Sequence, residues 1–245
     1  MTFEYLYINK KVTELYMSDI YNSVKETPQT VYDNYNNLMF SGDGRVFNKM
    51  MKRAELYMQV KDLAGDILEF GVFKGAGLAL FLNLKMMYEP NSIMKVIGFD
   101  YFNSENLTNS LDGLNKTMMS AVLNRAHAEE LSVESVKKRL SNFKEDTYKL
   151  IEGEAVESAI QFRMDNPGAR IKLLYMDLDL GEPTYKILKT LWNKVVKHGI
   201  IVLDEYAYHK WDESDGVDKF LKEVEGQYTF IDTKIGSPTA YIIKV

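Results

Sequence analysis

The chain has 245 residues, a formal net charge of −5 and no cysteine. This composition excludes disulfides and cysteine-based zinc sites, and the charge gives no reason to expect a nucleic-acid partner. Hydrophobic residues make up 46% of the chain, which suffices for a packed core. No apolar run reaches the roughly 18 residues of a membrane span, and the first residues lack the pattern of a signal peptide. We therefore expect a cytoplasmic α/β protein, without a membrane partner, that has one main domain and an appended segment.

Residues 1–62 differ from the rest of the chain because they are rich in Tyr, Asn and Met and contain no convincing strand. We predict an N-terminal helical segment here, with a boundary before residue 63. Its Tyr-Asn stretch, residues 32–39, is either a lid or a contact with a neighbouring chain, so a homo-oligomer is one of the two alternatives. An amphipathic helix is predicted over Val46 to Leu63. One face of that helix would carry Val46, Met50, Ala54 and Met58, with Lys61 to Leu63 near the same face.

From residue 66 onward, short apolar runs alternate with helical patterns. Strands are predicted at Asp66–Phe70, Lys95–Phe99, Tyr148–Ile151, Ile171–Met176, Ile200–Leu203, Tyr228–Asp232 and Ala240–Val245. Helices are predicted at Ala76–Tyr88, Val156–Met164, Tyr185–Val196 and Val217–Val224, with two more in residues 103–145, the second beginning at Ser132. His198-Gly199 would end the third of the named helices as a glycine cap. The alternation predicts a doubly wound, mostly parallel seven-stranded sheet. The last two strands lack an intervening helix, so they should form an antiparallel hairpin.

A glycine-rich turn joins the first predicted strand to its helix: Glu69-Phe-Gly71-Val-Phe-Lys-Gly75-Ala-Gly77. Glycines let the backbone approach a ligand closely, and the following helix offers free N–H groups. The spacing fits neither the dinucleotide fingerprint nor the P-loop. It resembles the E-x-G-x-x-x-G turn of class I S-adenosylmethionine (SAM) methyltransferases, whose Rossmann-like sheet also ends in an antiparallel hairpin. The alternative is a tight strand-to-helix turn in another α/β protein.

Acidic residues follow nearly every predicted strand: Glu69, Asp100, Glu154, Asp177 with Asp179, and Asp204 with Glu205. Such residues collect at one edge of a parallel sheet, where like charges repel unless cations or hydrogen bonds offset them. The alternative is that some of them cap helices or face solvent.

Three of these acidic residues are candidate cofactor contacts. Asp100, followed by Tyr101, is placed to bind ribose hydroxyls. Glu154 would accept the adenine amino group, and Glu69 would anchor the turn or the ligand ammonium. At the two strand ends that should adjoin the first strand, Asp177, Asp204 and Glu205 offer oxygen ligands for Mg²⁺ or Mn²⁺. Whether Asp179 replaces Asp177 as a ligand stays open.

Four segments resemble the macrocin O-methyltransferase family, whose members methylate sugar hydroxyls of macrolides and related natural products. They are GDILEFGVFKGAG, GFDYF, LLYMDLDLGEPTYKIL and GIIVLDEYAYH. The resemblance spans about residues 60–245 and implies SAM as methyl donor and a metal held by Asp177, Asp204 and Glu205. The family usually has Asp-Asp at the last two of these positions and a tyrosine where this chain has Gly181. The first 60 residues match poorly, so a macrolide acceptor does not follow.

These features together predict a Mg²⁺-dependent SAM O-methyltransferase that acts on a hydroxyl of a small molecule, such as a sugar or another natural-product intermediate. Either Asp177 or His209, which follows the last acidic pair, would take the hydroxyl proton; His209 could equally be an ordinary loop residue. Two alternatives stay open. One is a related SAM and metal enzyme with a hydroxylase-like reaction, and the other is a non-catalytic module that binds SAM or a nucleotide.

Overall fold

The computed structural model describes residues 28–245, so the expectations for residues 1–27 lie outside the described part. The chain divides into two compact units between Phe47 and Asn48. Helix α2 (Gln29–Phe40) belongs to the first unit and buries none of its residues. Helix α3 (Gly44–Val60) crosses the division, so its residues from Asn48 onward belong with the sheet. The division therefore comes earlier in the chain than the predicted boundary before residue 63.

The second unit is built on one seven-stranded sheet. Its strands are β1 (Asp66–Phe70), β2 (Val96–Asp100), β3 (Tyr148–Glu152), β4 (Ile171–Met176), β5 (Val195–Leu203), β6 (Tyr228–Asp232) and β7 (Ala240–Lys244). They lie in the order β3-β2-β1-β4-β5-β7-β6. The first five strands are parallel, whereas β7 is antiparallel to both β5 and β6. The predicted fold class is confirmed, including the terminal hairpin.

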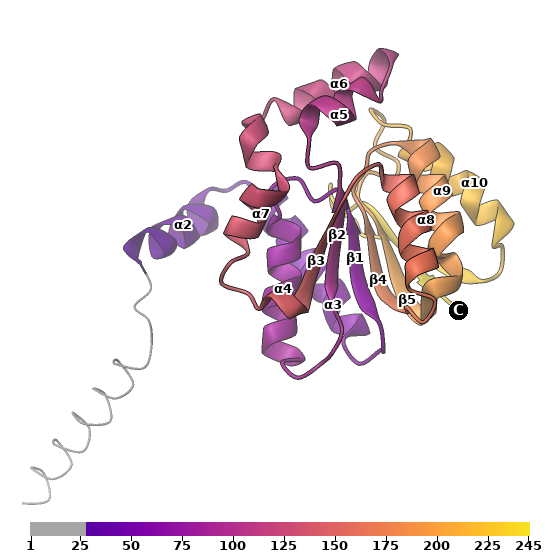
Figure 1. Ribbon diagram of the computed structural model, residues 1–245, viewed down its shortest axis with the longest axis horizontal. Coiled ribbons are helices and arrows are strands. Elements are labelled where there is room, and N and C mark those ends of the chain that lie inside the picture. Colours follow the sequence, from indigo (N-terminus) through magenta and orange to yellow (C-terminus); the bar gives the residue numbers. More distant parts are fainter. Residues whose placement is uncertain (1–27) are drawn as a thin grey trace, which may run out of the picture. The chain divides into compact units, whose positions relative to one another are not determined.

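Helices cover both faces of this sheet (Figure 1). One face carries α8 (Ala155–Asp165), α9 (Gly181–Leu191) and α10 (Glu213–Glu223). The other carries the second-unit part of α3, α4 (Ala76–Tyr88) and α7 (Val133–Arg139). The shorter elements are α5 (Ser104–Asn109), α6 (Gly113–Leu123), η1 (Ala128–Leu131), η2 (Glu145–Thr147) and η3 (Trp192–Lys194). Within residues 28–245, no helix is long and apolar enough to span a membrane.

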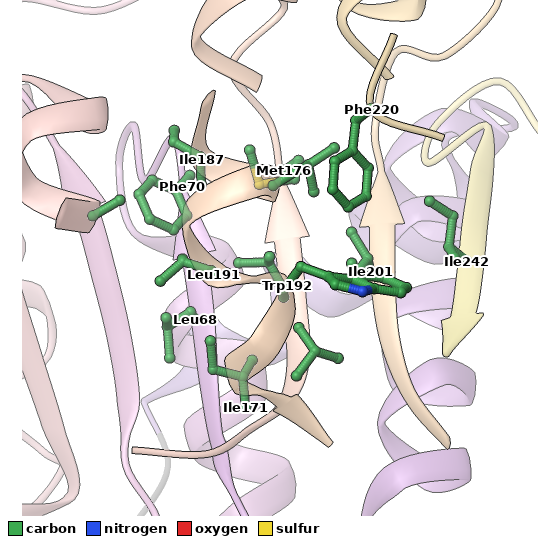
Figure 2. Close-up of a cluster of buried hydrophobic side chains, with 14 of the residues drawn as sticks. Leu68, Phe70, Ile171, Met176, Ile187, Leu191, Trp192, Ile201, Phe220 and Ile242 are labelled. Carbon is green, nitrogen blue, oxygen red and sulfur yellow. The ribbon is translucent and has the colours of Figure 1, made fainter. Parts of the chain in front are cut away.

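The larger hydrophobic core lies between the sheet and helices α8, α9 and α10 (Figure 2). Phe70 of β1 stacks on Phe99 of β2, with ring centroids 4.2 Å apart. Trp192 packs edge-on against Phe220 of α10 at 5.4 Å. Burying each large apolar side chain contributes roughly 1.5–3 kcal/mol. The parallel strands are therefore held at fixed spacing, which fixes the positions of the residues that follow them.

Part of the prediction for the segment before β5 is wrong. Helix α9 ends at Leu191 rather than near Val196, and β5 begins at Val195, so His198-Gly199 lies inside a strand instead of capping a helix. The pairing of β4 with β5 shifts between Ile171 and Leu173, and His198 adopts a positive φ of 65°. The irregularity is therefore centred on His198, and Gly199 makes room for it, since a Cβ there would lie 2.9 Å from the carbonyl oxygen of Val196.

The predicted apolar face of α3 is also wrong. Val46 and Met58 are exposed, whereas Arg53 is among the buried residues of the helix. The buried residues of the helix are Arg53, Leu56, Tyr57 and Val60, and Arg53 is buried there because it pairs with carboxylates at the ends of the strands. At its far end the helix is tied down by Tyr57, whose hydroxyl donates to Glu89 at 2.5 Å.

Candidate active site

The turn after β1 is held by Asp100, the last residue of β2. One carboxylate oxygen of Asp100 accepts hydrogen bonds from the backbone N–H groups of Val72 (2.8 Å) and Phe73 (2.9 Å). Burial raises the pKa of Asp100, and these hydrogen bonds oppose that rise. Gly71 and Gly75 have φ of 88° and 87°, which side-chain-bearing residues rarely adopt. The structure therefore gives Asp100 a defined role in shaping the turn, and ribose binding by Asp100 stays a prediction.

The glycines of the turn serve close packing at two places. A Cβ on Gly71 would lie 1.9 Å from the carbonyl oxygen of Asp177, so this glycine lets the turn pass the end of β4. A Cβ on Gly77 would lie 1.8 Å from Nη1 of Arg53 and 2.1 Å from Oε1 of Glu69. Gly77, in the first turn of α4, thus makes room for the ion pair between Arg53 and Glu69.

That ion pair joins Arg53 of α3 to Glu69 of β1, and both side chains are almost completely buried. The guanidinium also lies over the ring of Tyr175, 3.7 Å from its centroid, and its Nη2 is 3.5 Å from Asp177 Oδ2. Glu69 was predicted to anchor the turn or a ligand ammonium. Here its carboxylate is paired with a cation of the protein itself, and a ligand contact stays a prediction.

Asp177 and Asp204 meet at one point because their strands are neighbours. The backbone N–H of Asp177 donates to Phe70 and that of Asp204 to Met176, so each follows directly from the sheet pairing. Between the two carboxylates lies Lys49 of α3, whose Nζ is 2.9 Å from Asp177 Oδ2 and 2.8 Å from Asp204 Oδ2. The lysine ammonium therefore stands where the sequence predicted a metal ion.

The remaining acidic residues of the edge outnumber the nearby cations. Burial, followed by the charge of Asp177, raises the pKa of Asp179 to about 8. Burial and the charge of Asp204 raise the pKa of Glu205 to about 7. Glu213 of α10 is fully buried, and its Oε1 has no hydrogen-bond partner among the described residues. Carboxyl groups therefore outnumber cations at this edge of the sheet, and the raised pKa values mean that part of them is protonated near neutral pH.

The residues present do not fit the predicted metal site. Asp204 already accepts hydrogen bonds from Tyr175 (2.5 Å), Ser237 (2.8 Å) and Lys49, so both of its oxygens are engaged. Across residues 28–245, no three Asp, Glu or His side chains converge in a way that could hold a metal ion. Among the described residues, Glu205 and the two aspartates do not form a preassembled set of three ligands, and metal binding by Glu205 stays a prediction.

The other predicted site residues have separate places. Glu154 is the N-cap of α8, and its side chain accepts a hydrogen bond from the backbone N–H of Glu157 at 2.8 Å. Tyr101 is half-buried just after β2. His209 lies exposed in the loop after β5, with its ring 5.3 Å from that of Tyr208. The structure does not bring His209 together with the carboxylates through any hydrogen bond of the described part.

Sequence reasoning missed Lys49, Arg53 and Glu213. The signal for the first two was present, because they are four residues apart and so share a face of the predicted helix. A buried carboxylate edge needs cations, and this pair was the nearest candidate upstream of the first strand. Glu213 gave no comparable signal, because one acidic residue in the first turn of a helix is ordinary.

The strand order with its antiparallel β7, and the glycine turn at the end of β1, define the class I methyltransferase fold. Similar solved structures agree. CalS11, described as a TDP-rhamnose 3'-O-methyltransferase in calicheamicin biosynthesis, has a TM-score of 0.63 and 23% identity over 96% of this chain and 94% of its own. The O-methyltransferase NovP has a TM-score of 0.61 and 19% identity, covering 80% of this chain and 78% of its own.

A third similar structure is TomG from Streptomyces achromogenes, an O-methyltransferase in complex with SAM. Its TM-score is 0.54, with 15% identity and 96% coverage of both chains. A comparison with curated proteins gave no significant match. The profile of the macrocin-O-methyltransferase (TylF) family matches residues 15–232. The chain therefore belongs to this family, and it is a SAM-dependent O-methyltransferase.

Proposed function

We propose that the protein transfers the methyl group of SAM to a hydroxyl of a small natural-product molecule, with a sugar hydroxyl as the favoured acceptor. The observation that carries the proposal is the family match over residues 15–232. The acceptor class is supported by CalS11, whose described substrate is a nucleotide-linked sugar. No described feature favours the hydroxylase-like or non-catalytic alternatives.

The methyl donor SAM would bind at the turn that contains Gly71 and Gly75, because this turn follows β1 at the carboxyl ends of the strands, where α/β sheets bind their ligands. Asp100 stabilises this turn by accepting hydrogen bonds from the backbone N–H groups of Val72 and Phe73. Tyr101 and Glu154 remain proposed contacts for the nucleoside part of the donor, with Glu154 doing so in addition to capping α8.

The hydroxyl proton must leave as the new O–CH₃ bond forms. Asp177 is the better placed of the two predicted bases, because it adjoins both the turn and the end of β1. Burial and the neighbouring Asp204 raise its pKa above the ordinary value, which makes it a stronger base than a solvated aspartate. His209 lies exposed on a loop and is retained as the second candidate for this role.

The test incubates the purified protein with SAM and a panel of nucleotide-linked sugars, and follows S-adenosylhomocysteine and the methylated product by mass spectrometry. Calorimetry measures binding of S-adenosylhomocysteine in parallel. Asp100→Asn should weaken that binding at least about tenfold, since it loses charge-assisted hydrogen bonds to the turn. A product that gains oxygen instead of CH₂ would favour the hydroxylase-like reading. Binding without turnover across the panel would favour the non-catalytic one.

A further inference from the structure

The position between Asp177 and Asp204 is occupied by a cation that the chain itself supplies. Lys49 reaches it from α3, with Nζ within 2.9 Å of both carboxylates. One helical turn further on, Arg53 packs against Tyr175, and two turns on Tyr57 donates to Glu89. The lysine therefore projects from a helix that is fixed at two further points, unlike a surface lysine with a freely moving stem.

The ammonium group has one donor left for a ligand. A lysine carries three N–H donors, and the two aspartates take two of them. The Lys49 side chain keeps 31% of its surface exposed, so it is not sealed inside the protein and an acceptor molecule can approach it. A fixed cationic donor beside a developing alkoxide stabilises its charge, as an oxyanion hole does.

We infer that Lys49 does in this chain the work that the family resemblance assigned to a divalent metal: it binds the acceptor oxygen beside Asp177 and makes methyl transfer independent of added metal. This inference rests on the proposed function. In the transfer step the acceptor oxygen forms its bond to the methyl carbon while the S–CH₃ bond breaks. The sulfonium becomes a neutral thioether, and the hydroxyl proton passes to the carboxylate of Asp177.

The first test measures metal binding and does not depend on catalytic turnover. The protein is titrated with Mn²⁺, and the free Mn²⁺ is followed by electron paramagnetic resonance. The wild-type protein should bind no Mn²⁺ at this point, because Lys49 occupies it and Asp204 is fully hydrogen-bonded. Lys49→Met should gain a site for about one Mn²⁺ per chain, since two aspartates then face a vacated position. Adding Asp204→Asn to that variant should remove the new site.

Lys52→Met is the matched control, because Lys52 lies on the same helix and pairs with Glu55 instead of the strand-end carboxylates. It should bind Mn²⁺ no better than the wild type. The inference is overturned if the wild type binds one Mn²⁺ that Asp204→Asn abolishes, or if Lys49→Met gains no site. Should Lys49→Met fail to fold, Lys49→Gln and the wild-type titration give the same decision.

The second test uses the methyl-transfer assay after dialysis against EDTA. The wild type should keep its turnover, and Lys49→Met should lose at least about tenfold in kcat with unchanged affinity for S-adenosylhomocysteine. Turnover that EDTA removes and Mn²⁺ restores would overturn the inference while leaving O-methyl transfer intact. A wild type that methylates no acceptor under any condition counts instead against the proposed function, and the Mn²⁺ titration still decides the role of Lys49.

Discussion

The buried pair of Arg53 and Glu69 makes a sharp prediction for Arg53→Met. Methionine keeps most of the apolar volume of the arginine stem but removes the charge, so Glu69 is left unpaired at 1% exposure. Removing one partner of a buried ion pair costs about 3–5 kcal/mol, mainly because the other charge stays buried. At about 2–4 °C per kcal/mol for a domain of this size, the melting temperature should fall by about 6–20 °C.

The pH dependence of this loss has a definite sign. Burial already raises the pKa of Glu69 against the effect of Arg53, and without Arg53 that pKa rises further. A carboxyl group whose pKa is raised in the folded state destabilises the protein above that pKa and ceases to do so once it is protonated. The deficit of Arg53→Met should therefore be largest at pH 8 and shrink toward pH 5.

Urea unfolding of four proteins measures the effect: the wild type, Arg53→Met, Arg53→Met with Glu69→Met, and Arg45→Met as control. The double variant removes both charges and should recover at least about 2 kcal/mol of the unfolding free energy that Arg53→Met loses. Replacing a whole buried ion pair with apolar residues often leaves the stability almost unchanged. The Arg45 side chain is 89% exposed, so its replacement should cost less than about 0.5 kcal/mol. A loss below about 1 kcal/mol in Arg53→Met, or no recovery in the double variant, would refute the argument.

Three further predictions concern single residues. Gly71→Ala should lower the free energy of unfolding by about 2–5 kcal/mol in thermal melts, because backbone strain adds to the clash with the carbonyl of Asp177. Gly113→Ala is the control: Gly113 has a φ of 55° and open space around it, so its replacement should cost only about 1–2 kcal/mol. Equal losses of stability in the two variants would contradict the role of the clash. The pKa of about 8 for Asp179 means that its charge destabilises the fold increasingly from about pH 4 to 8. Solvent screens this partly exposed carboxyl, so Asp179→Asn should raise the free energy of unfolding by only about 1–2 kcal/mol at pH 9 and by almost nothing at pH 5. A stabilisation that does not depend on pH would be inconsistent with charge repulsion. His209→Ala should keep kcat within about threefold if Asp177 is the base, and a drop of tenfold or more in steady-state assays would transfer that role to His209.

The strands could be predicted because each is a short apolar run bounded by turn residues. Once the strands were predicted, the position of the residues that follow them, at one edge of the sheet, could be predicted as well. Asp177 and Asp204 meet as expected, since parallel neighbouring strands leave no other place for them. The end of α9 could not be predicted in the same way. The sequence pattern of Trp192 to His198 suits a helix, and only the packing of Trp192 on Phe220 and the shifted pairing of β5 decide otherwise.

The identity of the cation between the two aspartates depends on a contact that sequence periodicity hides. Polar residues on a helix are ordinarily assigned to solvent, so the pattern placed the buried face of α3 along Val46 and Met58. A helix that covers a row of carboxylates reverses this rule, because an unpaired buried carboxylate costs more than the desolvation of a well-paired lysine or arginine. The same carboxylates can therefore call for a bound metal or for cations from a neighbouring helix. In this structure Lys49 and Arg53 lie one turn apart and both contact Asp177, which is the arrangement that our proposal for Lys49 rests on.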